Sequence, residues 1–419
     1  MWKNLLVLLV GIGSTYQQCF ETNPTSPGVI SEKEVTGITE FGFDVYKQLL
    51  SDFGYRNMVF SPYSLWNALL LTYFGTSGTT QAQLESALRV KDKASAFDLK
   101  KGLDNWYLLL QRNNPDSFFG VANRLYFDVL LNIRPCIRNI LRDELQLGYL
   151  FDGRSTARYI NDYIQKATRG RIEKVASPRD FENVHMVIVN AAAFKGTWKY
   201  EFKSQNNTRM LFNVSRELTV NAVMMRQQAQ FRYGESDELG ARILELPYTG
   251  EQISMFLLLP RPDTPFEDRF VNMVHRLNSR TLGEAIDPKN LDLLDVDLAL
   301  PRFNFSSDIG HHLEKILTSM GIVDIFNDET ANLTGFTMKR GLSVSQALHK
   351  SFVEVNEEGT EATGVTAILI SSRSSQGSLK PMPFHLLEPF VFLICERNTR
   401  SPLFLGHVKN PFDIQRDEL

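Results

Sequence analysis

Apolar residues in much of the chain recur every three or four positions, which is the period of an amphipathic helix. Ser61 followed by Pro62 marks one helix start, because serine caps a helix and proline suits its first position. The pattern predicts these helices: Phe41–Leu50, Leu65–Phe74, Ala82–Leu88, Leu99–Leu110, Tyr159–Ala167, Phe270–Leu277 and Leu313–Met320.

Strands are predicted by runs of β-branched and aromatic residues, most of them in the second half. No repeat, low-complexity tract or long linker divides the chain. We therefore expect one α+β domain over residues 35–412, with large antiparallel or mixed sheets. The predicted strands are Phe119–Phe127, Met186–Phe194, Ala241–Tyr248, Ile253–Leu259, Leu293–Phe305, Phe390–Cys395 and Leu403–Val408.

The segment between Glu357 and Pro389 has no helical period and no clear turn signal. A structureless loop of this length is uncommon in a compact domain unless it is functional or disordered. From Thr360 onward, alternate positions are uncharged, so one face of the segment could be buried in a sheet as a new strand. Glu361 would then lie on the other face, and Gly359 supplies a joint at the base.

Arg373 stands where this strand-like part gives way to serine and glycine. A protease with an acidic primary pocket would select arginine by charge pairing and bidentate hydrogen bonding. The simpler interpretation is a flexible surface loop that tolerates cutting. That interpretation does not explain the alternation or the β-branched run from Val365 to Ile370.

The N-terminal residues indicate the secretory pathway. Lys3, the apolar run Leu5–Val10 and the small residues from Gly11 onward form a signal peptide, which we place at residues 1–18. We expect a secreted, extracellular glycoprotein, because four glycosylation sequons agree with this address. The acceptor residues are Asn206, Asn213, Asn304 and Asn332.

The last residues, 413–419, form a tail that ends in Arg416-Asp417-Glu418-Leu419. This ending is similar to the KDEL-type signal that retrieves proteins to the endoplasmic reticulum. An acidic surface tail that happens to end in these residues is the alternative, and the sequence leaves both open.

Composition and motifs exclude several classes of protein. The 419 residues carry a formal net charge of −3, which gives no general attraction to nucleic acid or to an anionic membrane. The three cysteines, Cys19, Cys136 and Cys395, exclude a full disulfide framework and offer no CxxC metal spacing, and Cys395 is expected to be a buried free thiol. No GxSxG, HExxH or P-loop motif is present, so we expect no catalytic residue, cofactor or metal.

At the base of the loop the sequence resembles the serpin family. The segment Glu357-Glu358-Gly359-Thr360-Glu361-Ala362-Thr363-Gly364 is similar to the family's inhibitory hinge, E-x-G-T-E-A followed by small residues. The family's cleaved bond follows the seventeenth residue counted from the hinge glutamate, and counted from Glu357 that residue is Arg373. Other similar segments are Asn57–Ser64, Val189–Trp198, Pro389–Phe392 and Ser401–Gly406.

The resemblance implies a fold and a set of roles. The fold would be a single-domain serpin fold, with a large central mixed β-sheet, smaller sheets, about nine helices and an exposed reactive-centre loop. Trp198 would lie at the breach, where insertion of the loop begins, and Arg302 would pair there with Glu357. Polar residues beneath the main sheet would form a hydrogen-bonded cluster, the shutter: Ser61, Ser64, Asn190 and His349.

The resemblance also implies a function. A trypsin-like serine protease would attack the bond between Arg373 and Ser374 and be trapped as a covalent acyl complex when the loop enters the sheet. The inhibitor itself is expected to be a monomer. Thr363 and Val365 depart from the pattern, because they are bulkier than the alanine often found in the hinge. The alternative is a non-inhibitory serpin that acts as a chaperone or carrier in the endoplasmic reticulum, favoured by the tail.

One basic cluster near the predicted fourth helix suggests a further partner. Some serpins bind heparin there, so a weak glycosaminoglycan site is one interpretation. A solvated helix face is the interpretation we favour. The cluster consists of Arg89, Lys91, Lys93, Lys100 and Lys101.

Overall fold

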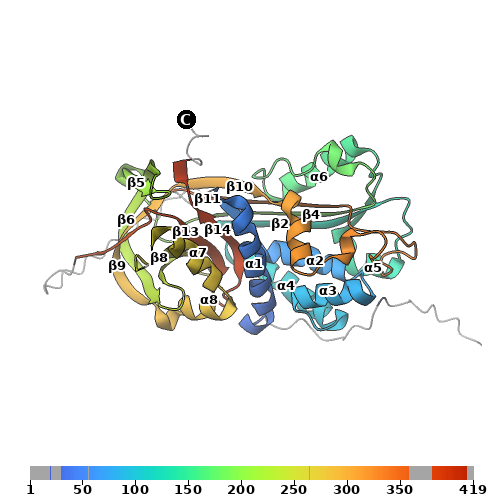
Figure 1. Cartoon of the computed structure of the whole chain (residues 1–419), viewed down its shortest axis with the longest axis horizontal. Helices are drawn as coiled ribbons and strands as arrows, with labels where there is room; N and C mark the ends of the chain where they lie inside the picture. The colour runs from blue at the N-terminus through green and yellow to red at the C-terminus, as the bar shows by residue number, and fades with distance from the viewer. Residues whose placement is uncertain (1–18, 20–29, 55, 264, 358–379, 413–419) are drawn as a thin grey trace, which may run out of the picture.

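The computed structural model describes Cys19 and residues 30–54, 56–263, 265–357 and 380–412 (Figure 1). The helices in this part of the chain are α1 (Glu32–Phe53), α2 (Pro62–Tyr73), α3 (Gly78–Leu88), α4 (Lys93–Asn113), α5 (Pro135–Leu141), α6 (Gly153–Ala167), α7 (Phe266–Arg276), α8 (Ser279–Ala285) and α9 (Gly310–Ser319). The strands are β1 (Met58–Phe60), β2 (Ser117–Asp128), β3 (Leu145–Gly148), β4 (Met186–Gly196), β5 (Thr208–Asn213), β6 (Thr219–Ser236), β7 (Ala241–Pro247), β8 (Ile253–Pro260), β9 (Asp292–Pro301), β10 (Phe303–Asp308), β11 (Gln346–Val355), β12 (Met382–His385), β13 (Phe390–Glu396) and β14 (Pro402–Val408).

These strands form two sheets. Five make one sheet in the order β10-β11-β4-β2-β3, and nine make the other in the order β1-β14-β13-β8-β7-β6-β9-β12, with β5 paired to β6. Both sheets are mixed, because β11 runs parallel to β4 in the first and β12 runs parallel to β9 in the second. The α+β fold with mixed sheets that the sequence predicts is confirmed.

β4 is buried on both of its faces. Ile188 and Phe194 belong to the main core, to which α2 also contributes, whereas Val187 and Val189 belong to a second core that includes one side of α6. The alternation follows from the two-residue period of a strand. A strand covered on both faces reads as a continuous apolar run, which explains why this strand is predicted so clearly. Figure 1 shows α6 lying over the five-stranded sheet.

One predicted strand is wrong in its extent. The apolar run Leu293–Phe305 is divided in the structure, because β9 ends at Pro301 and β10 begins at Phe303. The two strands belong to different sheets. Arg302 lies at the change of sheet, where its backbone N–H donates to the carbonyl of Val223 over 3.3 Å. Hydrophobic residues continue through both strands, so the sequence pattern does not indicate that the chain passes from one sheet to the other at Arg302.

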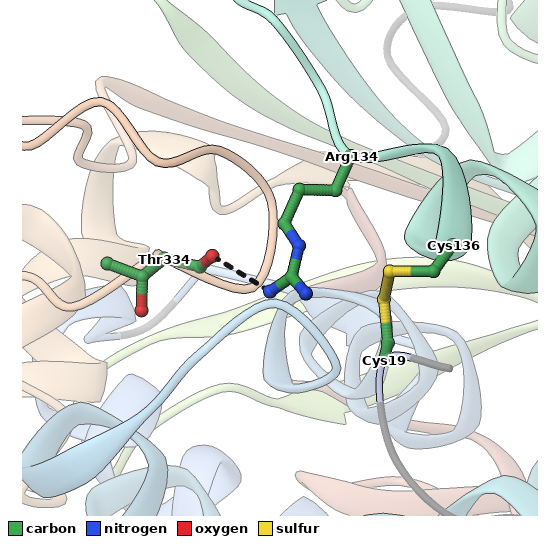
Figure 2. The surroundings of a disulfide bond; sticks show 4 residues. All are labelled: Cys19, Arg134, Cys136 and Thr334. Carbon is green, nitrogen blue, oxygen red and sulfur yellow. Dashed lines mark hydrogen bonds between the residues drawn. A yellow bond between two sulfur atoms is a disulfide. The ribbon is translucent and has the colours of Figure 1, made fainter. Parts of the chain in front are cut away.

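A disulfide joins Cys19 to Cys136 (Figure 2). It ties the N-terminal part of the chain to α5, across a sequence separation of 117 residues. Arg134, next to this helix, donates from its Nη1 to the carbonyl of Thr334 over 3.4 Å. The cysteine count alone did not predict this pairing. Cys395 is free and buried, as expected.

None of the helices in the described ranges is long and apolar enough to cross a bilayer. Nor do the described residues hold a group of three or more histidine, cysteine or acidic side chains placed to bind a metal ion.

Candidate strand-insertion site

β4 and β11 lie side by side in the middle of the five-stranded sheet and run parallel. Their register pairs Gln346 with Val187 at one end and Glu354 with Lys195 at the other. β11 ends at Val355, and the next strand in the described residues is β12, in the other sheet. A segment that turned back from β11 into the five-stranded sheet would run antiparallel to both β4 and β11. In this structure the two strands pair directly, so the sheet is closed.

A buried polar cluster lies between this sheet and α2. Asn190 on β4 donates from Nδ2 to Ser64 Oγ over 2.6 Å and to Asn123 Oδ1 on β2. Ser64 also donates to Asn123, over 3.0 Å. All three side chains are at most 6% exposed, so their hydrogen bonds have no competition from bulk water. The cluster links two strands of the sheet to the helix beneath it.

Ser61 bonds to the edge of this cluster, and His349 lies on the neighbouring strand without a hydrogen bond to it among the described contacts. Ser61 Oγ accepts from the backbone N–H of Ser64 over 3.1 Å and donates to the carbonyl of Leu403 on β14 over 2.6 Å. His349 is opposite Asn190 in the strand register, and its Nε2 lies 3.1 Å from Ser351 Oγ on its own strand. Its Nδ1 is buried and has no hydrogen-bond partner among the described residues.

Complete burial lowers the pKa of His349 to about 3. Burial, followed by the charge of Lys409, likewise lowers the pKa of His407 to about 3. In the unfolded chain a histidine takes up its proton near pH 6.5. Below that pH the unfolded state therefore binds more protons than the folded state. The free energy of unfolding is unaffected by these histidines above about pH 6.5 and decreases as the pH drops toward 3.

We therefore expect His349→Gln to weaken the acid sensitivity of this protein. Each such histidine contributes a slope of about 1.4 kcal/mol per pH unit below pH 6.5, and the variant lacks one of them. The measurement is the urea midpoint of unfolding at pH 7 and at pH 5. His275→Gln, at an exposed position on α7, is the control and should keep the wild-type difference. An unchanged slope in His349→Gln would contradict the assignment.

The end of the β4–β11 pair nearest the loop is held by a second group of contacts. Lys195 Nζ lies 2.9 Å from Glu354 Oε1, and Asn356 Nδ2 donates to the same oxygen over 2.8 Å. Trp198 Nε1 donates to the carbonyl of Asn356 over 2.9 Å. The chain is therefore fastened to β4 and its extension immediately after β11 ends.

Trp198 owes its position to aromatic packing. Its ring stacks on Tyr248, with centroids 4.4 Å apart and planes 12° from parallel. Gly196 makes room for this pair, because a Cβ there would lie 2.5 Å from Tyr248 Cδ1. The spacing of Gly196 and Trp198 is thus explained by the close approach of Tyr248, just after β7, to the end of β4.

Glu357, the last described residue before the loop, is also held on two sides. Its carbonyl accepts from the backbone N–H of Phe202 over 3.2 Å, and its Oε1 accepts from Asn207 Nδ2 over 2.5 Å. The side chain is buried, with 6% of the residue exposed. The pairing of Glu357 with Arg302 stays a prediction. The other hinge residues, Gly359 to Gly364, and the bond between Arg373 and Ser374 lie outside the described residues.

Comparison with known proteins agrees with this arrangement. The chain matches the family described as Serpin (serine protease inhibitor) over residues 36–411. It is 30% identical to a human leukocyte elastase inhibitor, covering 89% of this chain and 98% of the relative. It is 31% identical to Serpin B8 of Bos taurus, covering 88% and 97%.

This chain belongs to the serpin family. A solved structure of native protease nexin-1 with heparin has the same fold, with a TM-score of 0.80 at 25% identity, covering 91% of this chain and 100% of that one. The family is described as serine protease inhibitors and the relative is named an inhibitor, so family membership supports protease inhibition and a protein that is not an enzyme. The sequence resemblance and the serpin fold are both confirmed.

Several contacts of this serpin were missed at the sequence level. Asn123 is the clearest, because it is a polar residue inside the apolar strand Phe119–Phe127 and could have been noticed on that ground. Ser351, Asn207 and Asn356 carry no comparable signal. They stand in polar or short segments, where the sequence does not show which side chains meet.

The basic cluster has little free positive charge in the structure. Arg89 pairs with Asp44 over 2.7 Å, and Lys101 pairs with Asp98 over 2.8 Å. Lys100 is buried between Asp104 and Glu144, at 2.7 and 2.9 Å. Lys93 is half-buried, and its Nζ donates to the carbonyl of Thr76 over 2.5 Å. These contacts favour the solvated and neutralised helix face over a glycosaminoglycan site.

The sequons are placed where a glycan could be attached. Asn206, Asn213 and Asn304 are exposed, and Asn332 is half-buried, with its Oδ1 accepting from Thr334. Asn206 immediately precedes Asn207, the residue that holds Glu357. Their modification stays a prediction.

We expect Asn207→Ala to loosen the base of the loop. The buried carboxylate of Glu357 would lose a hydrogen bond, which costs about 1–3 kcal/mol for a buried charged group. The sequon at Asn206 keeps its threonine, so glycosylation is not altered by design. The measurement is the thermal unfolding midpoint, which should fall by several degrees. Gln205→Ala, an exposed neighbour, should leave the midpoint unchanged; a fall of equal size in both variants would count against the contact.

Proposed function

We propose that this serpin inhibits a trypsin-like serine protease by offering the bond between Arg373 and Ser374 as bait. The observation that carries the proposal is the agreement between two independent features of the loop. The hinge motif fixes the cleaved bond by its count from Glu357, and the residue found there is an arginine. Arginine suits a protease with an acidic primary pocket. The elastase inhibitor among the relatives shares the family and does not set the specificity of this loop.

The proposed mechanism uses the protease's own chemistry. Its serine attacks the carbonyl carbon of Arg373, the peptide bond to Ser374 breaks, and the protease stays attached as an acyl-enzyme. The freed segment from Glu357 to Arg373 then enters the sheet between β4 and β11 and draws the tethered protease with it. Strand insertion of this kind is the behaviour that general principles already assign to serpins.

The closed sheet supports an insertion that is favourable in energy. Opening it breaks one parallel pairing, between β4 and β11, and insertion makes two antiparallel pairings in its place. Antiparallel pairing is slightly more stable per residue. About fourteen inserted residues, at roughly 0.5–1.5 kcal/mol net per new hydrogen bond, would supply on the order of 10 kcal/mol. That is enough to compete with the few kcal/mol that keep the protease's oxyanion hole in order.

The direct test mixes the purified protein with trypsin and analyses the products on a denaturing gel and by mass spectrometry. A band at the summed mass, together with a released peptide that begins at Ser374, is the expected result. Cleavage at Arg373 without that band would reject trapping. It would favour instead the non-inhibitory chaperone or carrier of the endoplasmic reticulum, for which the ending Arg416–Leu419 is the specific support.

We also propose that the protein is made in the secretory pathway. The disulfide between Cys19 and Cys136 supports this, because disulfides form and persist in oxidising compartments. It also limits the signal peptide, since cleavage after Cys19 would remove one of the two sulfurs.

The mature protein is therefore expected to begin at or before Cys19. The measurement is mass spectrometry of the N-terminal peptide from the secreted protein, before and after reduction. Without reduction this peptide should remain linked to the one that contains Cys136, and reduction should release it. A mature N-terminus beyond Cys19 would contradict the boundary, and two free thiols at these positions would contradict the oxidising compartment.

A further inference from the structure

Large apolar side chains are exposed together beside the N-terminal end of α6, away from the insertion site. Leu130 is 80% exposed, Phe151 71%, Tyr149 62% and Tyr159 50%. Single exposed apolar residues are normal, but a contiguous group of them marks a surface that binds something. We call these four residues, with Arg154 and Arg158, the α6 patch.

Contacts between neighbouring segments join most of the patch into one surface. The rings of Tyr149 and Phe151 meet edge to face, with centroids 5.7 Å apart. Val129, next to Leu130, donates its N–H to the carbonyl of Gly148 over 2.8 Å, which places that turn beside the end of β3. The turn that carries Leu130 and the segment from Tyr149 to Phe151 are both bonded to regular structure, so the backbone beneath these apolar side chains is well defined.

The patch continues onto α6 itself. Thr156 Oγ1 donates to the carbonyl of Tyr149 over 3.1 Å, which fixes the first turn of the helix against the aromatic pair. Tyr159 packs edge to face on Tyr126 of β2, with centroids 6.3 Å apart. One side of its ring is therefore held while half of the residue remains open to solvent.

The charge of the patch is positive. Arg154 and Arg158 are exposed one helical turn apart, and neither forms an ion pair with a carboxylate in the described part of the chain. Asp152, the acid nearest to Arg154 in sequence, is engaged as the helix cap, because its Oδ1 accepts from the backbone N–H of Ser155 over 3.2 Å. Hydrogen bonds from Ser155 and, to a lesser extent, the charge of Arg154 lower the pKa of this aspartate. Asp162, one helical turn after Arg158, is exposed, and the two arginines are the charges that the patch offers to a partner.

The backbone beside the patch offers a further binding feature. β3 is the last strand of the five-stranded sheet and pairs only with β2 in the described structure. Its outer edge can accept an added strand, which is how many proteins bind an extended peptide. Aromatic residues and arginine are also the side chains that carry most binding energy at protein interfaces.

We propose that the α6 patch binds an extended, acidic segment of a partner protein, in which apolar side chains alternate with Asp or Glu. The apolar side chains would cover Tyr149, Phe151 and Leu130, and the carboxylates would pair with Arg154 and Arg158. A second copy of this chain fits less well, because a two-fold interface would place the same arginines against each other. The proposal does not depend on protease inhibition.

The test is a peptide-display selection on the purified full-length protein, without assuming a partner in advance. The expected result is enrichment of sequences that alternate acidic and apolar residues. The best of these, made as a fluorescent peptide, should bind at least about tenfold more weakly to the double variant Phe151→Ser/Arg158→Glu and more weakly at high salt. If the double variant is unstable, Arg158→Glu alone is used instead. It should keep the thermal midpoint of wild type and still bind the peptide more weakly.

A matched control is available on β5. Arg209 and Leu211 are exposed there in the same combination of charge and apolar surface, with Leu211 61% exposed. The double variant Arg209→Glu/Leu211→Ser should bind the peptide like wild type. The proposal is overturned by no enrichment, by peptides without acidic residues, or by equal binding to the patch variants. It is also overturned if the patch serves self-association in sedimentation or binding to anionic lipid vesicles instead of peptide binding.

Discussion

Replacing Thr360 with arginine should turn this inhibitor into a substrate. Thr360 belongs to the set of alternate positions that would face the interior when the loop enters the sheet. An arginine there would bring an unpaired charge into an apolar environment, at a cost of several kcal/mol. Each 1.4 kcal/mol added to the insertion barrier slows it about tenfold. The protease would then complete hydrolysis before it is trapped.

The measurement is the number of inhibitor molecules consumed per trypsin molecule inactivated. We expect it to rise more than about tenfold in Thr360→Arg, while the rate of cleavage after Arg373 stays the same. Glu361→Arg is the matched control, since the next residue of a strand faces the opposite side and would remain in water. Equal behaviour of the two variants would reject strand insertion and leave only cleavage at the loop.

The fold could be predicted in its class and in most of its elements because burial imposes a period. α2 and β4 are the clearest cases: each is buried along its length and each appears in the sequence as an apolar run. β6 was not predicted although it has 18 residues. Its positions alternate irregularly between buried and exposed, and Arg226 and Gln228 use their polar ends to bond Asp297 and Asp295 on β9. A strand stabilised by such pairs has no simple hydrophobic pattern.

The candidate site could be predicted in its members and only in part in its contacts. The resemblance to a family supplies Ser64 and Asn190, and the structure adds Asn123 between them. Which hydrogen bonds a buried polar side chain makes depends on side chains from distant segments, and no local pattern records that. The disulfide between Cys19 and Cys136 has the same origin, because it depends on where the N-terminal segment crosses the body of the protein.

Asn190→Ala should have the largest effect on the resting state of this serpin. The change removes two buried hydrogen bonds and leaves Ser64 and Asn123 with only the one between them, at about 0.5–1.5 kcal/mol for each bond lost. The sum is a sizeable part of the roughly 5–15 kcal/mol that stabilise a typical protein. Because Asn190 stands on the strand that must separate from β11, the loss also lowers the cost of opening the sheet. We therefore expect a lower thermal midpoint together with faster spontaneous loss of trypsin inhibition at 37 °C.

Gln230→Ala, at an exposed position on β6, should change neither the thermal midpoint nor the rate of that loss. A variant that loses stability but keeps its inhibitory activity over time as wild type does would show that the cluster stabilises the protein without controlling entry to the sheet.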